Sequence, residues 1–137
     1  MTTTDILRGV KLFNGMTDRT LEAIAGLASE STFVDGEQLV REGDAGDTFI
    51  VLVDGAARVE RDGRQIADLS HGDFLGEISL IDGGPRTATV TAQGPVSALV
   101  VRHDDFRRLI DEFAAIRYDI LTALARRIRR DASDPSL

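Results

Sequence analysis

Hydrophobic and polar residues follow three different patterns along the chain, and the first pattern is helical. After Thr17, apolar side chains recur every three residues, at Leu21, Ile24 and Leu27, which is the spacing of one buried helix face. Thr17 has a side chain that favours a helix N-cap. Met16 and Leu21 stand at the two positions of a hydrophobic staple. We therefore expect an amphipathic helix after Thr17 that packs on the core.

The middle of the chain, residues 31–102, has the pattern of short strands. Apolar and polar positions alternate there, and a period of two is typical of a half-buried strand. Asp-Gly occurs at 35–36, 54–55, 62–63 and 82–83, and His-Gly at 71–72, which are turn sequences. The pattern predicts strands at Gln38–Arg41, Thr48–Val53, Ala56–Arg61, Arg64–Leu69, Thr87–Ala92 and Val96–Arg102. Short strands at this spacing indicate an antiparallel sandwich, roll or barrel.

The last zone is helical again. Asp104 is predicted to cap a short helix that carries Phe106. A longer helix follows, with an apolar stripe at Phe113, Ile116, Ile120, Leu124 and Ile128. Four further residues widen the stripe on one side, namely Leu121, Ala125, Tyr118 and Ala114. The whole apolar arc then covers about 200°, nearly twice what one buried face needs. We expect it to contact the strands and also a ligand, another helix or a second subunit, with Tyr118 as a candidate lid or interface residue.

Composition favours one domain. The chain has 137 residues, of which 42% are hydrophobic and 28% charged, an ordinary globular balance. We expect a single domain over residues 1–137, with a helical start at 4–29, strands at 31–102 and C-terminal helices at 104–131. There is no cysteine, which excludes disulfides and thiolate metal sites. Residues 1–13 lack a signal-peptide pattern, and no apolar run is long enough to cross a membrane, so we expect a cytoplasmic protein.

The charge balance restricts the partners. Net charge is −7, from 16 basic and 23 acidic residues. Nucleic-acid binding draws its affinity from basic surface, so nucleic acid is not an expected partner. A small anionic ligand would need a local site of arginine and backbone N–H groups.

Residues 74–90 can supply such a site. They read Phe-Leu-Gly-Glu-Ile-Ser-Leu-Ile-Asp-Gly-Gly-Pro-Arg-Thr-Ala-Thr-Val. A glycine precedes a predicted helical turn, whose N–H groups and positive dipole end attract an anion. Arg86 follows, and its guanidinium can make two parallel bonds to a phosphate. The residues alone predict a phosphate cradle, although a glycine and an arginine ten residues apart are common by chance.

This segment resembles the phosphate-binding cassette of the cyclic nucleotide-binding domain family. That cassette starts Phe-Gly-Glu-Leu/Ile-Ala/Ser-Leu and ends Pro-Arg-Ala/Ser/Thr-Ala-Thr/Ser-Val, and the main departure here is Leu75 between Phe74 and Gly76. Arg-Glu-Gly-Asp at 41–44 and Thr-Phe-Ile-Val at 48–51 also resemble the family. The resemblance implies a mainly β fold, an eight-stranded antiparallel β-roll of the jelly-roll type with an N-terminal helical segment and two C-terminal helices.

The resemblance also implies roles for individual residues. Arg86 would pair with the cyclic phosphate, and Glu77 would accept a hydrogen bond from the ribose 2′-hydroxyl. Thr87 would lie beside the purine, but family members with threonine there bind either cAMP or cGMP. Backbone N–H groups are candidate donors to the phosphate and ribose at Gly76, Ile78, Ser79 and Ala88.

These inferences favour a regulatory binding module and not an enzyme. We expect it to bind a cyclic nucleotide, cAMP more than cGMP, without a further cofactor, and to respond by repositioning its C-terminal helix. A protein effector is the expected partner, and a homodimer through that helix is an alternative. We expect neither nucleic acid nor a membrane as a direct partner.

Two other functions share parts of this pattern. A cupin-like β-roll enzyme needs three or four His and carboxylate ligands on adjacent strands, whereas this chain has only His71 and His103, neither at metal-ligand spacing from a partner. A catabolite-activator-type transcription regulator joins such a sensor to a helix-turn-helix domain. Only seven residues follow Arg130, so that interpretation requires a truncated chain.

Overall fold

The computed structural model describes residues 2–10, 13, 15–76, 83–119, 121–122 and 125. Helices α1 (Thr3–Arg8) and α2 (Asp18–Ala25) come before the strands, and α4 (His103–Glu112) follows them. The strands are β1 (Ser29–Phe33), β2 (Gln38–Val40), β3 (Thr48–Arg61), β4 (Arg64–Leu69), β5 (Phe74–Leu75) and β6 (Thr89–Arg102). Residues 114–119 are also helical.

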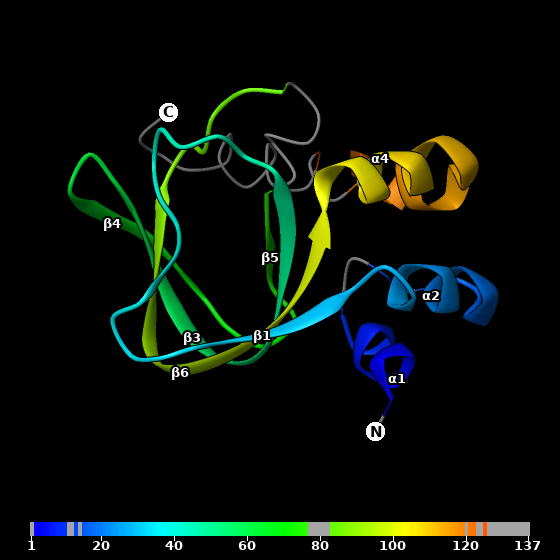
Figure 1. Cartoon of the computed structure of the whole chain (residues 1–137), viewed down its shortest axis with the longest axis horizontal. Helices are drawn as coiled ribbons and strands as arrows, with labels where there is room; N and C mark the ends of the chain where they lie inside the picture. The colour runs from blue at the N-terminus through cyan, green and yellow to red at the C-terminus, as the bar shows by residue number, and fades with distance from the viewer. Residues whose placement is uncertain are drawn as a thin grey trace.

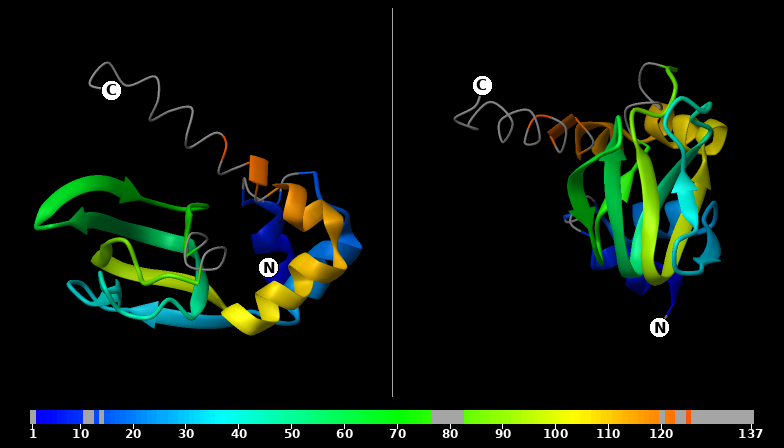
Figure 2. Two further views of the ribbon diagram at one scale, coloured as in Figure 1. Left: turned by 90° about the horizontal axis from the view of Figure 1, so that it is seen from above. Right: turned by 90° about the vertical axis from the view of Figure 1, so that its left-hand side faces the viewer.

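The strands form one antiparallel sheet that curls into a roll. Its main order is β1-β6-β3-β4, with β2 paired to β6 and β5 paired to β3. β3 and β6 pair along most of their length, from Thr48 opposite Arg102 to Glu60 opposite Thr89. The helices gather at one end of the roll (Figures 1 and 2). The predicted mainly β roll with flanking helices is confirmed.

Alternating residues of β3 point into two different cores. Ile50 and Leu52 pack in the roll interior, here called the roll core, together with Ala57, Leu75, Val90, Ala92, Val96 and Ala98. Phe49 and Val51 point the other way, into what we call the helical core. That second cluster also contains Leu7, Val10, Phe13, Leu21, Ile24, Leu99, Val101, Phe106, Leu109 and Ile116. Because the side chains of a strand alternate between its two faces, one strand holds both cores together.

The number of strands differs from the predicted eight, since six are present in the described part of the chain. The two predicted strands on either side of Asp54-Gly55 are one continuous strand, β3. Gly55 has φ +94°, and a Cβ on it would lie 2.3 Å from the carbonyl oxygen of Pro95. The Asp-Gly pair therefore forms a bulge where two backbones approach closely, and not the predicted turn. Both structures need the positive φ that glycine adopts easily. β6 is likewise continuous across the gap between its two predicted halves, and it begins at Thr89.

Two of the predicted helix starts have different outcomes. Thr17 caps α2 as expected, because its hydroxyl oxygen accepts a hydrogen bond from the backbone N of Thr20 at 3.3 Å. The prediction that Asp104 caps the next helix is wrong. α4 begins at His103 with Arg102 at the N-cap position and no side-chain cap bond. Asp104 lies in the first turn, where its carboxylate interacts favourably with the positive end of the helix dipole but does not cap the helix.

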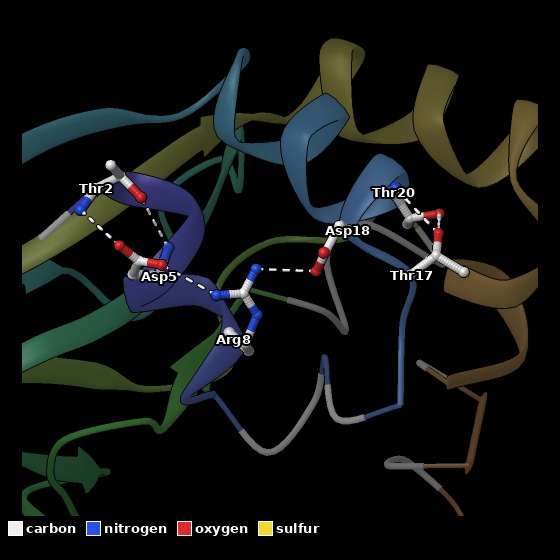
Figure 3. Close-up of polar contacts among 6 residues, drawn as sticks. All are labelled: Thr2, Asp5, Arg8, Thr17, Asp18 and Thr20. Carbon is white, nitrogen blue, oxygen red and sulfur yellow. Dashed lines mark hydrogen bonds and ion pairs between the residues drawn. The ribbon is translucent and has the colours of Figure 1, made fainter.

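An ion-pair network joins the two N-terminal helices. Arg8, in the last turn of α1, donates to Asp5 and to Asp18, each at 2.9 Å (Figure 3). Asp5 also forms a capping box with Thr2, and those hydrogen bonds, followed by Arg8, lower the pKa of its carboxyl. The network links the side chains of α1 to the first turn of α2. Because these side chains are exposed, it contributes little to stability.

The C-terminal residues that are described form one buried face and one exposed face. Phe106 and Ile116 are fully buried in the helical core. Tyr118 and Leu121 are 70% and 57% exposed. In the described part of the chain, the predicted apolar arc is therefore only partly buried. Three other members of its predicted stripe, Ile120, Leu124 and Ile128, lie outside the described residues. None of the described helices is long and apolar enough to cross a membrane.

Candidate functional site

Arg86 lies just before β6, and its backbone is held by the loop that leads into β3. Its N donates to the carbonyl oxygen of Asp44 at 2.8 Å, and its carbonyl oxygen accepts from the N of Gly43 at 3.0 Å. An isolated bridge between Ala45 and Pro85 continues the pairing. The arginine is therefore presented by a fixed backbone.

The Arg86 side chain points inward to the start of β3. It is only 6% exposed. Its Nη2 donates to both the carbonyl oxygen and the Oγ1 of Thr48, each at 2.9 Å. Burial of a guanidinium carries a desolvation cost that hydrogen bonds and an anion can offset.

Gly76 packs directly against this arginine. It has φ +100°, which side chains disfavour, and a Cβ built on it would lie 2.8 Å from Nη1 of Arg86 and 2.5 Å from the carbonyl oxygen of Thr48. Only glycine allows the backbone to come so near. Two of the predicted site residues, ten positions apart in sequence, are thus brought together.

The other predicted residues have different surroundings. Thr87 is exposed, and its carbonyl oxygen accepts from Nε of Arg61 at 2.9 Å. This bond ties the end of β3 to the segment that follows Arg86. Ala88 is buried at 9% exposure. Glu77, Ile78 and Ser79 lie outside the described residues.

His103 was not predicted as a site residue, yet it lies close to Arg86. Its backbone N donates to the carbonyl oxygen of Asp47 at 2.8 Å, and its Nε2 is buried without a hydrogen bond within the described residues. Burial lowers the pKa of His103, and the positive charges of Arg107 and Arg86 add to that effect. A hollow of about 400 Å³ adjoins it, lined by Gly46, Asp47, Thr48, Arg102, His103 and Asp104.

The site has the chemistry of anion binding and no described metal-binding group. Among the described residues, no three His, Asp or Glu side chains are grouped to hold a metal ion. What the geometry offers is one buried, oriented guanidinium beside a glycine backbone. That combination suits a phosphate.

Comparison with known proteins agrees with this chemistry. Residues 30–113 match the model of the family described as "Cyclic nucleotide-binding domain". A cGMP-dependent protein kinase of Caenorhabditis briggsae is 31% identical over 122 residues, which cover 84% of this chain and 16% of the kinase. A CRP-like cAMP-activated global transcriptional regulator of Mycobacterium tuberculosis is 30% identical over 131 residues, covering 92% of this chain and 58% of the regulator.

A solved structure gives the same result for the fold. The regulatory domain of Toxoplasma gondii PKA, crystallised with cAMP, superposes with a TM-score of 0.79 at 27% identity, covering 91% of this chain and 49% of that one. This chain therefore spans about a sixth of the Caenorhabditis briggsae kinase and somewhat over half of the Mycobacterium tuberculosis regulator.

Proposed function

The chain belongs to the cyclic nucleotide-binding domain family, and we propose that it acts as a cyclic nucleotide sensor in which Arg86 binds the cyclic phosphate. The observation that carries this proposal is the burial of Arg86 against Gly76. A planar guanidinium forms two parallel hydrogen bonds to a phosphate, and these bonds are strongest where water is excluded.

The rest of the proposed site follows the cassette. We assign Glu77 to the ribose 2′-hydroxyl and Thr87 to the edge of the purine. The exposure of Thr87 supports its assignment, since an exposed residue next to Arg86 can contact a ligand bound there. The proposed backbone donors to the phosphate and ribose are those of Gly76, Ile78, Ser79 and Ala88.

We propose cAMP as the preferred ligand, with cGMP as its competitor. The Mycobacterium tuberculosis regulator is named as cAMP-activated and aligns with 92% of this chain, and the Toxoplasma gondii structure holds cAMP. The Caenorhabditis briggsae kinase is named for cGMP. A test must therefore use both nucleotides.

The proposed output is a repositioning of the C-terminal helical segment that is read by a protein effector in the cytoplasm. Part of the apolar surface of that segment is exposed, at Tyr118 and Leu121, which supports a contact outside the domain. A second candidate is the sensor part of a transcription regulator, which the match to the Mycobacterium tuberculosis protein favours. The two candidates share the ligand and differ in the effector.

The decisive experiment is a calorimetric titration of the chain with cAMP and with cGMP. We expect micromolar or tighter binding of at least one, about −8 kcal/mol or more. Arg86→Ala should weaken binding by about 30-fold to several-thousand-fold, because removing one partner of a desolvated charge pair costs about 2–5 kcal/mol. Arg86→Lys should recover only part of this loss, since a point charge cannot replace the planar fork.

Arg64→Ala is the matched control, because Arg64 is an exposed arginine at the start of β4. It removes the same charge and should leave the affinity nearly unchanged. If neither nucleotide bound at millimolar concentration, the sensor proposal would be wrong. If Arg86→Ala stayed folded and bound normally, the phosphate would have to lie elsewhere.

A further inference from the structure

Thr48 accepts two hydrogen bonds from the Arg86 guanidinium. Nη2 of Arg86 donates to two oxygens of this one residue, the carbonyl oxygen and Oγ1, both at 2.9 Å. The two N–H groups of Nη2 are enough to serve both acceptors. Two bonds from one nitrogen to one residue restrict the rotation of the guanidinium plane.

The opposite edge of the guanidinium faces the cassette. Nη1 is the atom that a Cβ on Gly76 would approach to 2.8 Å. The arginine thus has one edge bound to β3 and another directed at the glycine backbone where the proposed phosphate binds. Because the arginine side chain is already ordered, it loses little conformational entropy when an anion binds.

Thr48 is itself well supported. It is the first residue of β3 and pairs with Arg102 of β6, and the next two residues, Phe49 and Ile50, are almost fully buried. Its neighbour Asp47 accepts a hydrogen bond from the backbone N of His103. The support under Arg86 is therefore a paired strand end and not a loose loop.

The kind of oxygen on Thr48 matters as well. A carboxylate at this place would pair with the guanidinium and compete with the phosphate for its charge. A hydroxyl is a neutral acceptor, so it orients the guanidinium without cancelling the positive charge. The carbonyl oxygen would be available from any residue, whereas the Oγ1 contact depends on the side chain.

We propose that the hydroxyl of Thr48 is a positioning group that orients Arg86 for the phosphate of the ligand. The inference rests on the proposed function and goes beyond it, because it names a residue outside the cassette. Thr48→Val keeps the shape and the strand preference of the side chain but removes the acceptor. Thr48→Ser keeps the acceptor.

The test is a double-mutant cycle measured by calorimetric titration with cAMP. Thr48→Val should weaken binding by about three- to tenfold, the effect of one hydrogen bond, while Thr48→Ser should stay within about twofold of the unsubstituted chain. In the Arg86→Ala background, Thr48→Val should have almost no further effect, since its partner is gone. If Thr48→Val bound cAMP as tightly as the unsubstituted chain, the proposal would be overturned. It would also be overturned if Thr48→Val weakened binding by the same factor in the Arg86→Ala background as in the unsubstituted chain.

A second measurement needs no ligand. Side-chain ¹⁵N NMR of Arg86 should show hindered rotation of the guanidinium in the unsubstituted chain and in Thr48→Ser, and faster rotation in Thr48→Val. Equal rotation in all three would contradict the positioning role. If the chain bound no nucleotide, the sensor function would fail, and the NMR comparison would still decide whether Thr48 orients Arg86.

Discussion

The two cores of this protein are held together in different ways. The roll core lies between strands whose backbones are paired, with β3 and β6 in register over most of their length. In the helical core, the backbone of α4 is tied at its first residue, since the N of His103 donates to the carbonyl oxygen of Asp47. Beyond that residue, α4 meets the sheet through side chains such as Phe106, which stacks on Phe49 with ring centroids 4.6 Å apart. Backbone pairing fixes the distance between strands, whereas side-chain packing alone allows a helix to shift over the surface it covers.

The dependence between the two cores runs in one direction. The helical core uses one face of β3 and β6, through Phe49, Val51, Leu99 and Val101. Among the described residues, the roll core contains only residues of the strands. The helices therefore need the strands more than the strands need the helices. Arg86 and Thr48 lie at the β3 end next to the start of α4, where a ligand can influence the region that is easier to move.

The first prediction, with the largest effect, compares one large truncation in each core. Phe106→Ala should cost about 3–5 kcal/mol of stability and Leu52→Ala about 2–5 kcal/mol. The pattern of amide hydrogen exchange should differ more than the cost. Phe106→Ala should speed exchange in α4 and residues 114–119 while the strands stay protected, because the helices can open locally. Leu52→Ala should speed exchange everywhere.

Equal acceleration in helices and strands in both variants would mean that the two cores unfold as one unit. Chemical denaturation of the same two variants supplies the total loss of stability. With equal acceleration in both variants, the two cores would differ in the residues they contain but not in how easily each opens.

The second prediction concerns the bulge that keeps β3 continuous. Gly55 and Gly63 both have positive φ, but a Cβ at Gly55 would meet the backbone of Pro95 at 2.3 Å, and a Cβ at Gly63 meets nothing within 4 Å. Gly63→Ala should cost about 1–2 kcal/mol from the backbone conformation alone. Gly55→Ala should cost about 1–3 kcal/mol more, because the two strands must move apart. Similar midpoints of urea unfolding for the two variants would rule out the close approach.

The same bulge shows what sequence reasoning could and could not predict. Val59 between charged neighbours and the apolar run at Phe49–Val53 were enough to predict the strands. Asp54-Gly55 predicted a turn, because the backbone freedom of glycine serves turns and bulges equally. β1 was not predicted, since Ser-Glu-Ser-Thr-Phe has little apolar alternation and becomes a strand through pairing with β6.

The candidate site also contains residues that the sequence predicted and residues that it did not. Gly76 and Arg86 were predicted because they belong to one short segment with a recognisable order. The roles inferred for Thr48 and His103 were not, since each depends on contacts that only the fold creates. Thr48 is 38 residues from Arg86. Long-range contacts of this kind leave no local pattern in a single sequence.

The third prediction concerns the response to ligand. We expect cAMP binding to increase the protection of amides from hydrogen exchange in residues 113–130, while β3 and β6 change little. The reason is that side-chain contacts can be exchanged at a smaller cost than a backbone ladder. Arg86→Ala at the same cAMP concentration is the control, since it should lose the change. Increased protection confined to residues 76–88 would make the helix a static part of the helical core.

The last and smallest effect is expected at His103, where the two regions meet. Burial lowers the pKa of this imidazole below its ordinary value, Arg107 and Arg86 lower it further, and Asp104 and Asp47 act in the opposite direction. A histidine whose pKa is lower in the folded state binds its proton more readily when unfolded. Its contribution to stability is therefore present above about pH 6.5 and is lost as the pH falls through the folded-state pKa.

Urea unfolding from pH 7.5 to 5 should show the unsubstituted chain losing stability relative to His103→Gln, with His71→Gln as the control that removes the other histidine. A phosphate paired with Arg86 would offset one of the positive charges that lower this pKa, so cAMP should narrow the difference. A gap between the unsubstituted chain and His103→Gln that stays constant with pH would show that His103 does not titrate differently in the folded protein, and that the junction between roll and helices does not respond to acid.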